Sequence, residues 1–270
     1  MFEPIALVSL LLGSALVLLT MRLTFNYGQR IDNYSVVDAT WSVNFCVLVL
    51  CYALLSSAPL SHRLLLALPV SIWSLRLAWH LHWRIHGKPE EGRYVDLRRR
   101  WSEPEPAAFV PRMRRFYRFQ AYSNVILSLP MWVVCQNQQA QVATLEWIGA
   151  AIMLMSVLGE ALADAQLNGF KADPNRTERV CERGLWNYSR HPNYFFEWIF
   201  WVGLSCQSLA VGLWGLTGPV MAAIMLYLLL RVTGIKATEA QALRSKGEAY
   251  RRYQQTTSSF VPWFKKTSVL

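Results

Sequence analysis

Seven long apolar stretches recur along the chain, and they constrain its fold more than any other feature. They cover residues 4–21, 36–55, 64–81, 116–134, 145–162, 194–209 and 211–230. A helix needs about 20 predominantly apolar residues to cross a bilayer, and these stretches reach or approach that length. Hydrophobic residues make up 53% of the chain and charged residues only 16%, which excludes intrinsic disorder. The sequence therefore predicts an all-α, polytopic membrane protein with about seven transmembrane helices.

The basic residues between these stretches alternate between the two sides of the predicted membrane. Of the 27 Lys and Arg residues, 24 lie in segments 22–35, 82–115, 163–193 and from 231 onward. The intervening segments 56–63, 135–144 and 208–212 contain only Arg63. Because cytoplasmic loops carry the excess of Lys and Arg, we expect the N-terminus outside and the C-terminus in the cytoplasm. The net charge of +10 then reflects orientation, and binding of nucleic acid is not expected.

Several polar side chains fall within or beside the apolar stretches, where a charged group costs about 2.5–3.5 kcal/mol. They are Asp38, Arg76, His80, Glu160, Asp164 and Glu197. All lie toward the cytoplasmic half of the predicted topology, which favours a cavity on that side for a polar cofactor or substrate. The structural alternative is that the acidic residues complement helix ends and that Arg76 pairs with one of them.

The densest polar signal lies in residues 164–201. Basic residues alternate there with turn formers, and Pro192 then opens a helix, where its missing N–H does no harm. Free N–H groups at that helix start, with Arg179 and Arg190 nearby, predict a phosphate site. Asn193, Tyr194 and Glu197 follow and offer hydrogen bonds to a ribose, amide or base. A metal site is not expected, because the histidines lack a matching Cys or carboxylate pattern.

Residues 184–197, which read GLWNYSRHPNYFFE, resemble the C-terminal signature of the steroid 5α-reductase-like membrane proteins, and in particular their bacterial branch. The resemblance extends to residues 38–41, 87–94, 119–120 and 129–130, and it ends in Arg231, Glu239, Tyr250, Tyr253 and Pro262. It implies a single integral-membrane domain over residues 1–270, with a cofactor-binding C-terminal half at about 116–266. The expected location is a bacterial inner membrane, with the cofactor side cytoplasmic.

The resemblance also implies an activity. An NADPH-dependent oxidoreductase acting on CH–CH groups would reduce an activated carbon–carbon double bond of a steroid, isoprenoid or fatty enoyl substrate that enters from the bilayer. The candidate NADPH-binding residues are Arg76, Lys88, Asp164, Lys171, Arg179, Trp186, Arg190, His191, Asn193, Glu197, Arg231, Glu239 and Tyr250. No obligate protein partner is evident.

Such a reduction needs an acid beside the hydride donor. The candidates are Asp38, provided that desolvation keeps it protonated, and the phenols Tyr94 and Tyr194; Asp38 is the first choice. Steroid reductases grip the substrate carbonyl with a Gln-Glu pair on the second helix and a Tyr on the third. This chain has Asp38 and Arg76 on these helices instead, so the sequence leaves the substrate open.

A second enzyme class shares part of the pattern. Membrane methyltransferases of the isoprenylcysteine and phospholipid type, which use S-adenosylmethionine, have an Arg-His-Pro-x-Tyr helix opening and a C-terminal Glu…Tyr-x-x-Tyr pattern. Trp186 and the form of residues 189–194 favour the reductase. A non-catalytic transporter or scaffold is the third alternative. The residues from Arg179 to Tyr194 argue against it, because they are suited to bind phosphate.

Overall fold

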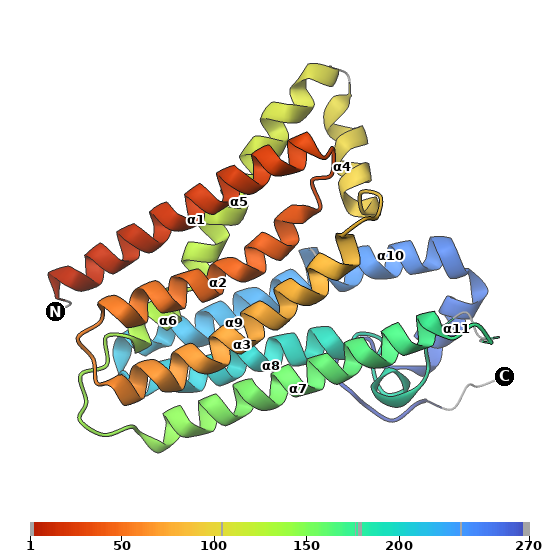
Figure 1. The fold of residues 1–270 in the computed structure, drawn as a ribbon. Coiled ribbons are helices and arrows are strands. Elements are labelled where there is room, and N and C mark those ends of the chain that lie inside the picture. Colours follow the sequence, from red (N-terminus) through yellow and green to blue (C-terminus); the bar gives the residue numbers. More distant parts are fainter. Residues whose placement is uncertain (1–2, 104, 176, 178–179, 233, 267–270) are drawn as a thin grey trace. The chain divides into compact units, whose positions relative to one another are not determined.

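The computed structural model describes residues 3–103, 105–175, 177, 180–232 and 234–266. In this part of the chain the regular elements are all helical (Figure 1). The fold divides into two compact units. Unit 1 comprises Met1–Trp147 and Ala210–Gly215, and unit 2 comprises Ile148–Leu209 and Leu216–Leu270. The predicted all-α class is thus confirmed, whereas the single domain over residues 1–270 stays a prediction.

Unit 1 is built from long helices joined by short connections. In chain order they are α1 (Pro4–Arg30), α2 (Val36–Leu55), α3 (Leu60–Ile85), α4 (Gly92–Ser102), the 3₁₀ turn η1 (Pro106–Ala108), α5 (Phe109–Leu127) and α6 (Leu129–Val134). Helix α1 packs against α2 and α5, and α2 packs against α3 (Figure 1). The buried positions of α1 recur every three or four residues, as expected for a helix with one packed face. Gly13 lies on that face, where a Cβ would come within 3.0 Å of Leu48.

Polar side chains connect the helices of unit 1 at depth. Thr20 of α1 donates a hydrogen bond to the Asn44 side chain on α2 (2.7 Å). The Asn44 amide in turn donates to Asn124 of α5 (3.2 Å), and Asn124 donates to the Trp41 carbonyl (2.9 Å). Hydrogen bonds of this kind help to hold helices together where lipid offers no alternative partner. They fix the register of α1, α2 and α5 relative to one another.

Unit 2 holds α7 (Thr144–Ala172) from residue 148 onward, the 3₁₀ turn η2 (Gly184–Asn187) and α8 (Pro192–Leu209). After the 3₁₀ turn η3 (Leu213–Leu216), of which only Leu216 belongs to unit 2, come α9 (Thr217–Tyr227), the π-helical turn η4 (Leu228–Val232), α10 (Ile235–Lys246) and α11 (Glu248–Thr256). Helices α7 and α8 cross at Gly149 and Gly203. A Cβ on Gly149 would lie 2.5 Å from the Gly203 carbonyl oxygen, so both positions require glycine for this close approach.

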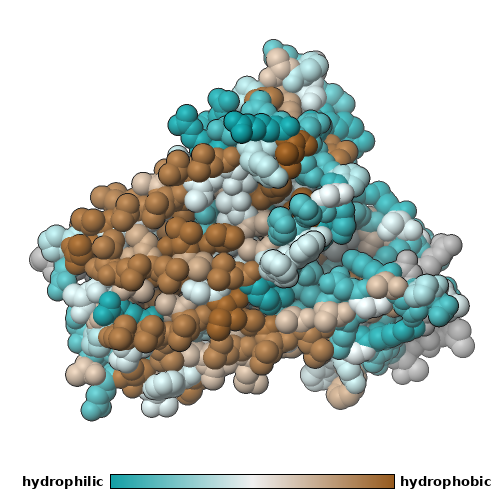
Figure 2. Space-filling model, in the orientation of Figure 1, coloured by the Kyte–Doolittle hydropathy of each residue, from teal (hydrophilic) through white to brown (hydrophobic). Residues whose placement is uncertain are grey.

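Five helical segments of the described chain are long and apolar enough to cross a membrane. They are Pro4–Arg30, Val36–Leu55, Leu60–Ile85, Thr144–Ala172 and Leu213–Lys246. Their surfaces carry many exposed large hydrophobic side chains, such as Leu11, Leu54 and Leu158. Figure 2 shows hydrophobic residues over α1, α2 and α3, whereas α4 is largely hydrophilic. The chain is therefore a multi-pass membrane protein.

Two of the predicted crossings are not among these five segments. The stretch 116–134 is divided between α5 and α6, which meet at Ser128 just before Pro130, and α5 contains four arginines. The stretch 194–209 forms α8, which begins at Pro192 as predicted and is 18 residues long. The fifth crossing continues further than expected, because α7 runs to Ala172. Phe170 is buried against Cys181 and Trp186, and this contact stabilises the extra turns.

Candidate functional site

The opening of α8 is the centre of a buried polar cluster in unit 2. Arg190 and His191 immediately precede Pro192, and both are largely buried. Arg190 Nε donates to Glu239 Oε1 on α10 (2.7 Å), and His191 Nε2 lies 3.3 Å from the same oxygen. The Gln254 amide of α11 donates to the other oxygen of Glu239 (2.8 Å). Glu239 thereby joins α8, α10 and α11, which sequence spacing could not show.

Most N–H groups of the Arg190 side chain donate hydrogen bonds to other residues of the protein. Besides Glu239, its guanidinium donates to the carbonyl oxygens of Gln254 (3.0 Å) and Thr257 (2.5 Å). An Arg with these partners holds the C-terminal segment against the opening of α8. Direct contact between Arg190 and a cofactor phosphate stays a prediction, and the geometry gives this residue a positioning role as well.

His191 is a neutral hydrogen-bond donor in this cluster. Burial lowers the pKa of His191 below its usual range, and the hydrogen bond to Glu239 opposes that effect. The neutral ring can donate from Nε2 to Glu239, which assigns the tautomer. Its face stacks on Tyr194, with ring centroids 5.4 Å apart and planes at 5°. The Tyr194 hydroxyl lies 3.1 Å from the Thr238 hydroxyl on α10.

A second contact links α7 to the first turn of α8. The Asn193 amide donates to Asp164 Oδ1 (3.3 Å), and Asp164 is buried. Asp164 was expected at the start of a loop, but it lies on α7, two turns before that helix ends. Glu197, one turn beyond Asn193 on α8, is also buried and accepts a hydrogen bond from Trp201 Nε1 (3.0 Å).

The turn before α8 is anchored on α7 by Trp186. Its indole N–H donates to the Ala163 carbonyl (2.9 Å), next to Asp164. Gly184 has a φ of +57°, and the neighbouring Leu185 N–H donates to the Gln166 side chain (2.9 Å). Tyr253 of α11 donates to the Trp186 carbonyl and packs against Tyr250, which is buried. Trp186 thus ties this turn to α7, and Tyr250 packs beside it through Tyr253.

The basic candidates of unit 2 are at its surface. Lys171 is exposed in the last turn of α7, and Arg231 is exposed in the π-helical turn η4. Among the described residues Arg231 has no hydrogen-bond or ion-pair partner. Single π-helical turns of this kind recur at functional sites. Arg176 and Arg179 lie outside the described residues.

The candidate acid lies in unit 1. Tyr94 of α4 is fully buried, and its hydroxyl donates to Asp38 Oδ1 on α2 at 2.6 Å. Burial, and next the Asp38 carboxylate, hold the pKa of Tyr94 well above its usual range. Tyr94 therefore remains a protonated phenol at neutral pH, with its hydrogen directed at Asp38. The sequence named both residues separately, and the structure brings them together.

The segment between α3 and α4 positions Tyr94. Glu90 accepts the Tyr34 N–H (2.8 Å) and pairs with Arg98 (3.0 Å). The Lys88 carbonyl accepts a hydrogen bond from Asn33, while the Lys88 side chain is exposed. Arg76 lies half-buried on α3. These contacts hold the start of α4 against the connection between α1 and α2.

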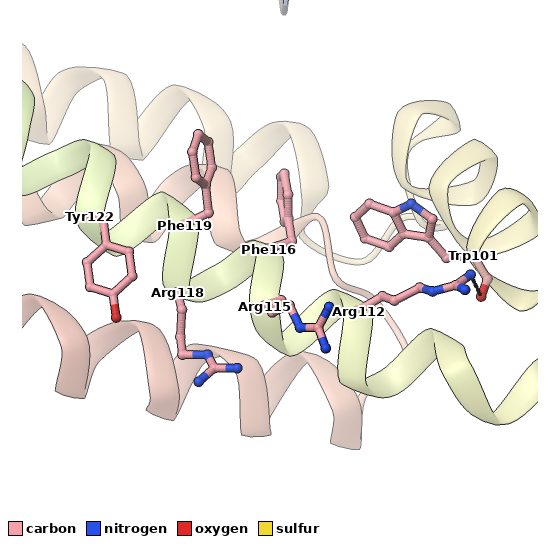
Figure 3. A pocket seen from close by; sticks show the side chains of 7 residues that line it. All are labelled: Trp101, Arg112, Arg115, Phe116, Arg118, Phe119 and Tyr122. Carbon is pink, nitrogen blue, oxygen red and sulfur yellow. Dashed lines mark hydrogen bonds between the residues drawn. The ribbon is translucent and has the colours of Figure 1, made fainter.

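Sequence reasoning missed two features of unit 1. One is a buried pair between His62 and Glu146 (2.7 Å), which gave no motif because the partners are 84 residues apart. The other is a groove between α4 and α5, lined by arginines and aromatic rings (Figure 3). No group of three or more potential metal ligands occurs within the described residues.

Comparison with known proteins gives a family and little else. No curated protein and no solved structure matches the chain. A family model described as "Protein of unknown function (DUF1295)" matches residues 24–257. That range includes α2 through α10 and every candidate site residue of both units. The chain is therefore a member of the DUF1295 family.

Proposed function

We propose that the protein crosses a bacterial inner membrane seven times, with its N-terminus outside and its C-terminus in the cytoplasm. The five apolar helical segments supply most of the crossings, and α5 with α6, together with α8, would supply the other two. The distribution of Lys and Arg supports this arrangement, because only Arg63 lies in the predicted external segments. The α8 opening would then face the cytoplasm, where nucleotide cofactors are found.

We propose that the protein is an NADPH-dependent reductase of an activated carbon–carbon double bond in a lipid-like substrate. One observation carries the proposal: residues that the steroid-reductase resemblance assigns to the cofactor converge around the opening of α8. Asp164 contacts Asn193, and Arg190 and His191 contact Glu239, although these partners are 29 to 49 residues apart. A purely structural helix would not need this many buried polar groups at one end.

The chemistry of these side chains suits a dinucleotide phosphate. Lys171 and Arg231 are exposed cations, and phosphate is bound by charge-assisted contacts from such groups. The buried Asp164 and Glu197 and the half-buried Asn193 offer the carboxylate and amide groups that bind a ribose or carboxamide. Lys171, Arg179 and Arg231 would hold the phosphates, and Asn193 and Glu197 the nicotinamide half. The bound cofactor would supply the hydride.

The Asp38–Tyr94 pair is the proposed source of the proton. Because the Tyr94 hydroxyl donates to Asp38 Oδ1, the phenol hydrogen is not available to a substrate. Asp38 would take up a proton at its second oxygen and pass it to the substrate carbonyl or to the carbon beside it. Tyr94 would then stabilise the resulting carboxylate through its short hydrogen bond. Asp38 is accordingly the proposed acid, and Tyr94 orients it.

The second candidate is an S-adenosylmethionine-dependent membrane methyltransferase. One observation favours it: the Arg190–His191 opening and Glu239, with Tyr250 and Tyr253, form one connected cluster. These are the positions that the methyltransferase pattern shares. The two proposals differ in the cofactor that the protein binds, so a measurement of cofactor binding distinguishes them.

The test is cofactor binding by the purified protein in nanodiscs, measured by calorimetry with NADPH, NADH and S-adenosylmethionine. We expect selective binding of NADPH. Lys171→Ala and Arg231→Ala should each weaken that binding by about 1.5–3 kcal/mol, the usual contribution of a charge-assisted hydrogen bond. Arg99→Ala is the matched control, since Arg99 is exposed on α4 and pairs only with Asp96. Tight binding of S-adenosylmethionine without NADPH binding would replace the reductase by the methyltransferase.

Asp38→Asn separates the chemistry from the binding. It removes the acid and keeps a side chain of the same size beside Tyr94, so NADPH affinity should be unchanged. Reduction of an enoyl or enone lipid should fall by about 100-fold or more, as expected when a general acid is lost. Unchanged turnover in Asp38→Asn would show that the proton comes from elsewhere.

A further inference from the structure

The first three turns of α5 present an unusual outer face. Met113, Tyr117 and Ala121 are buried on its inner face, while Arg112, Arg115 and Arg118 are exposed. The exposed arginines recur every three residues, so they lie along one side of the helix. They border a groove of about 690 Å³ between α5 and the end of α4. All residues that line the groove belong to unit 1.

The groove has a cationic side and an aromatic side. Figure 3 shows Phe116 and Phe119 extending together from α5, with Trp101 of α4 following them, while Arg115 and Arg118 extend from the other side of the helix. Tyr122 lies one turn further along and extends to the side of Arg118. None of the described residues that line the groove carries a carboxylate. Such a surface matches a ligand that combines a negative charge with an apolar part.

Two of the arginines are available for that charge. Arg112 donates to the Trp101 carbonyl (3.0 Å), which holds the end of α4 beside α5. Arg115 and Arg118, by contrast, have no hydrogen-bond or ion-pair partner within the described part of the chain. Arg99 and Arg100 on α4 differ in this respect, because both hydrogen-bond to Asp96.

In the proposed topology, in which α5 and α6 form a crossing, this groove would lie at the membrane surface. Basic residues occupy the first turns of α5, and the exposed aromatic rings Phe119 and Tyr122 follow toward its apolar end. Basic groups at headgroup depth with aromatic rings just below them are the arrangement found at lipid–water boundaries. A free anion would use the arginines and gain nothing from Phe119, which is 64% exposed.

We propose that the groove between α4 and α5 binds an anionic phospholipid, with Arg115 and Arg118 on the headgroup phosphate and Phe116 and Phe119 against the glycerol and upper acyl chain. The site is separate from the proposed reductase residues, none of which lines the groove. It rests on the proposed course of α5 into the membrane and not on the reductase, so loss of the reductase proposal would leave it standing.

The test is native mass spectrometry of the detergent-purified protein titrated with phosphatidylglycerol or with phosphatidylcholine of the same acyl chains. We expect preferential binding of phosphatidylglycerol. In Arg115→Gln/Arg118→Gln its affinity should fall by about fivefold for each arginine, the effect of one basic residue at an anionic lipid surface. The control, Arg99→Gln/Arg100→Gln, removes the same charge and should retain the parent affinity.

Two further measurements decide between a lipid and a free anion. Phe119→Ala should weaken phosphatidylglycerol binding severalfold, and inorganic phosphate at millimolar concentration should not displace the lipid. If both double variants lose the same affinity for phosphatidylglycerol, the effect comes from net charge alone and the proposal is overturned. Displacement by phosphate, or equal affinity for the two lipids, would overturn it as well.

Discussion

At the scale of single residues, buried polar side chains of this protein hydrogen-bond to specific partners elsewhere in the chain. Both ring nitrogens of His62 face acceptors: Glu146 Oε1 at 2.7 Å and the Gln139 carbonyl at 2.9 Å. Glu146 also accepts the Ala143 N–H (2.9 Å), so the same carboxylate caps the start of α7.

This arrangement predicts a large effect of Glu146→Gln. Gln at this position keeps only part of these hydrogen bonds, and a buried polar group left without its partner should lower the free energy of unfolding by about 1–3 kcal/mol. Thermal unfolding in detergent, followed by circular dichroism, measures it. Glu248→Gln is the control, because the Glu248–Arg251 pair is exposed and should contribute below about 1 kcal/mol. Similar melting temperatures for both variants would contradict the prediction.

His191 predicts a dependence of stability on pH. Because its pKa is lowered in the folded protein, the unfolded chain binds the proton more readily, and stability is lost as the pH falls below about 6.5. The charged groups beside the ring are Glu239 and Arg190, and the pKa of Glu239, which is lowered to about 2, keeps that carboxylate charged throughout this range. His191→Gln should flatten the curve of melting temperature between about pH 5 and 6.5. A variant with the slope of the parent would show that His191 protonates equally in both states.

At the scale of elements, small residues determine where helices can approach. Gly203 of α8 faces Gly149 of α7, and a Cβ on Gly203 would lie 2.7 Å from the Gly149 carbonyl oxygen and 2.8 Å from Met153 Cγ. Backbone atoms cannot yield as a flexible side chain would. Gly169, near the end of α7, has nothing within 4 Å of its Cβ position.

The two glycines therefore predict opposite effects. Gly203→Ala should destabilise the protein by about 1–3 kcal/mol through overpacking. Gly169→Ala should stabilise it by about 0.5–1 kcal/mol, because alanine loses less backbone freedom in a helix. Chemical or thermal unfolding of the two variants in the same detergent tests this. Stabilisation by Gly203→Ala would mean that α7 and α8 separate easily.

At the scale of the whole molecule, the charge asymmetry predicts topology. Reporter fusions after Arg100 and after Lys266 should both give a cytoplasmic signal, whereas a tag inserted in the connection at 138–141 should be accessible from outside. An external signal at either fusion point would refute the proposed orientation, and the α8 opening could not then face cytoplasmic cofactor.

The sequence by itself determined the helical class, the membrane environment and the residues at the α8 opening. Apolar length and proline position are local properties, so they need no knowledge of the fold: α1, α2, α3 and α7 include the predicted stretches, and α8 begins at Pro192. The predicted ends of the helices were less accurate. The contact of Phe170 with Trp186 extends α7 past Asp164, and no local signal encodes that packing.

Only the tertiary structure decided which polar groups meet. Asp38 with Tyr94, Arg190 with Glu239, and His62 with Glu146 are pairs separated by 49 to 84 residues. For each of these residues the sequence contains several possible partners of suitable charge, so the sequence alone does not specify the pair. Burial makes the choice, because a polar group removed from water must find its hydrogen bond inside the fold, and helix packing determines which group is within reach.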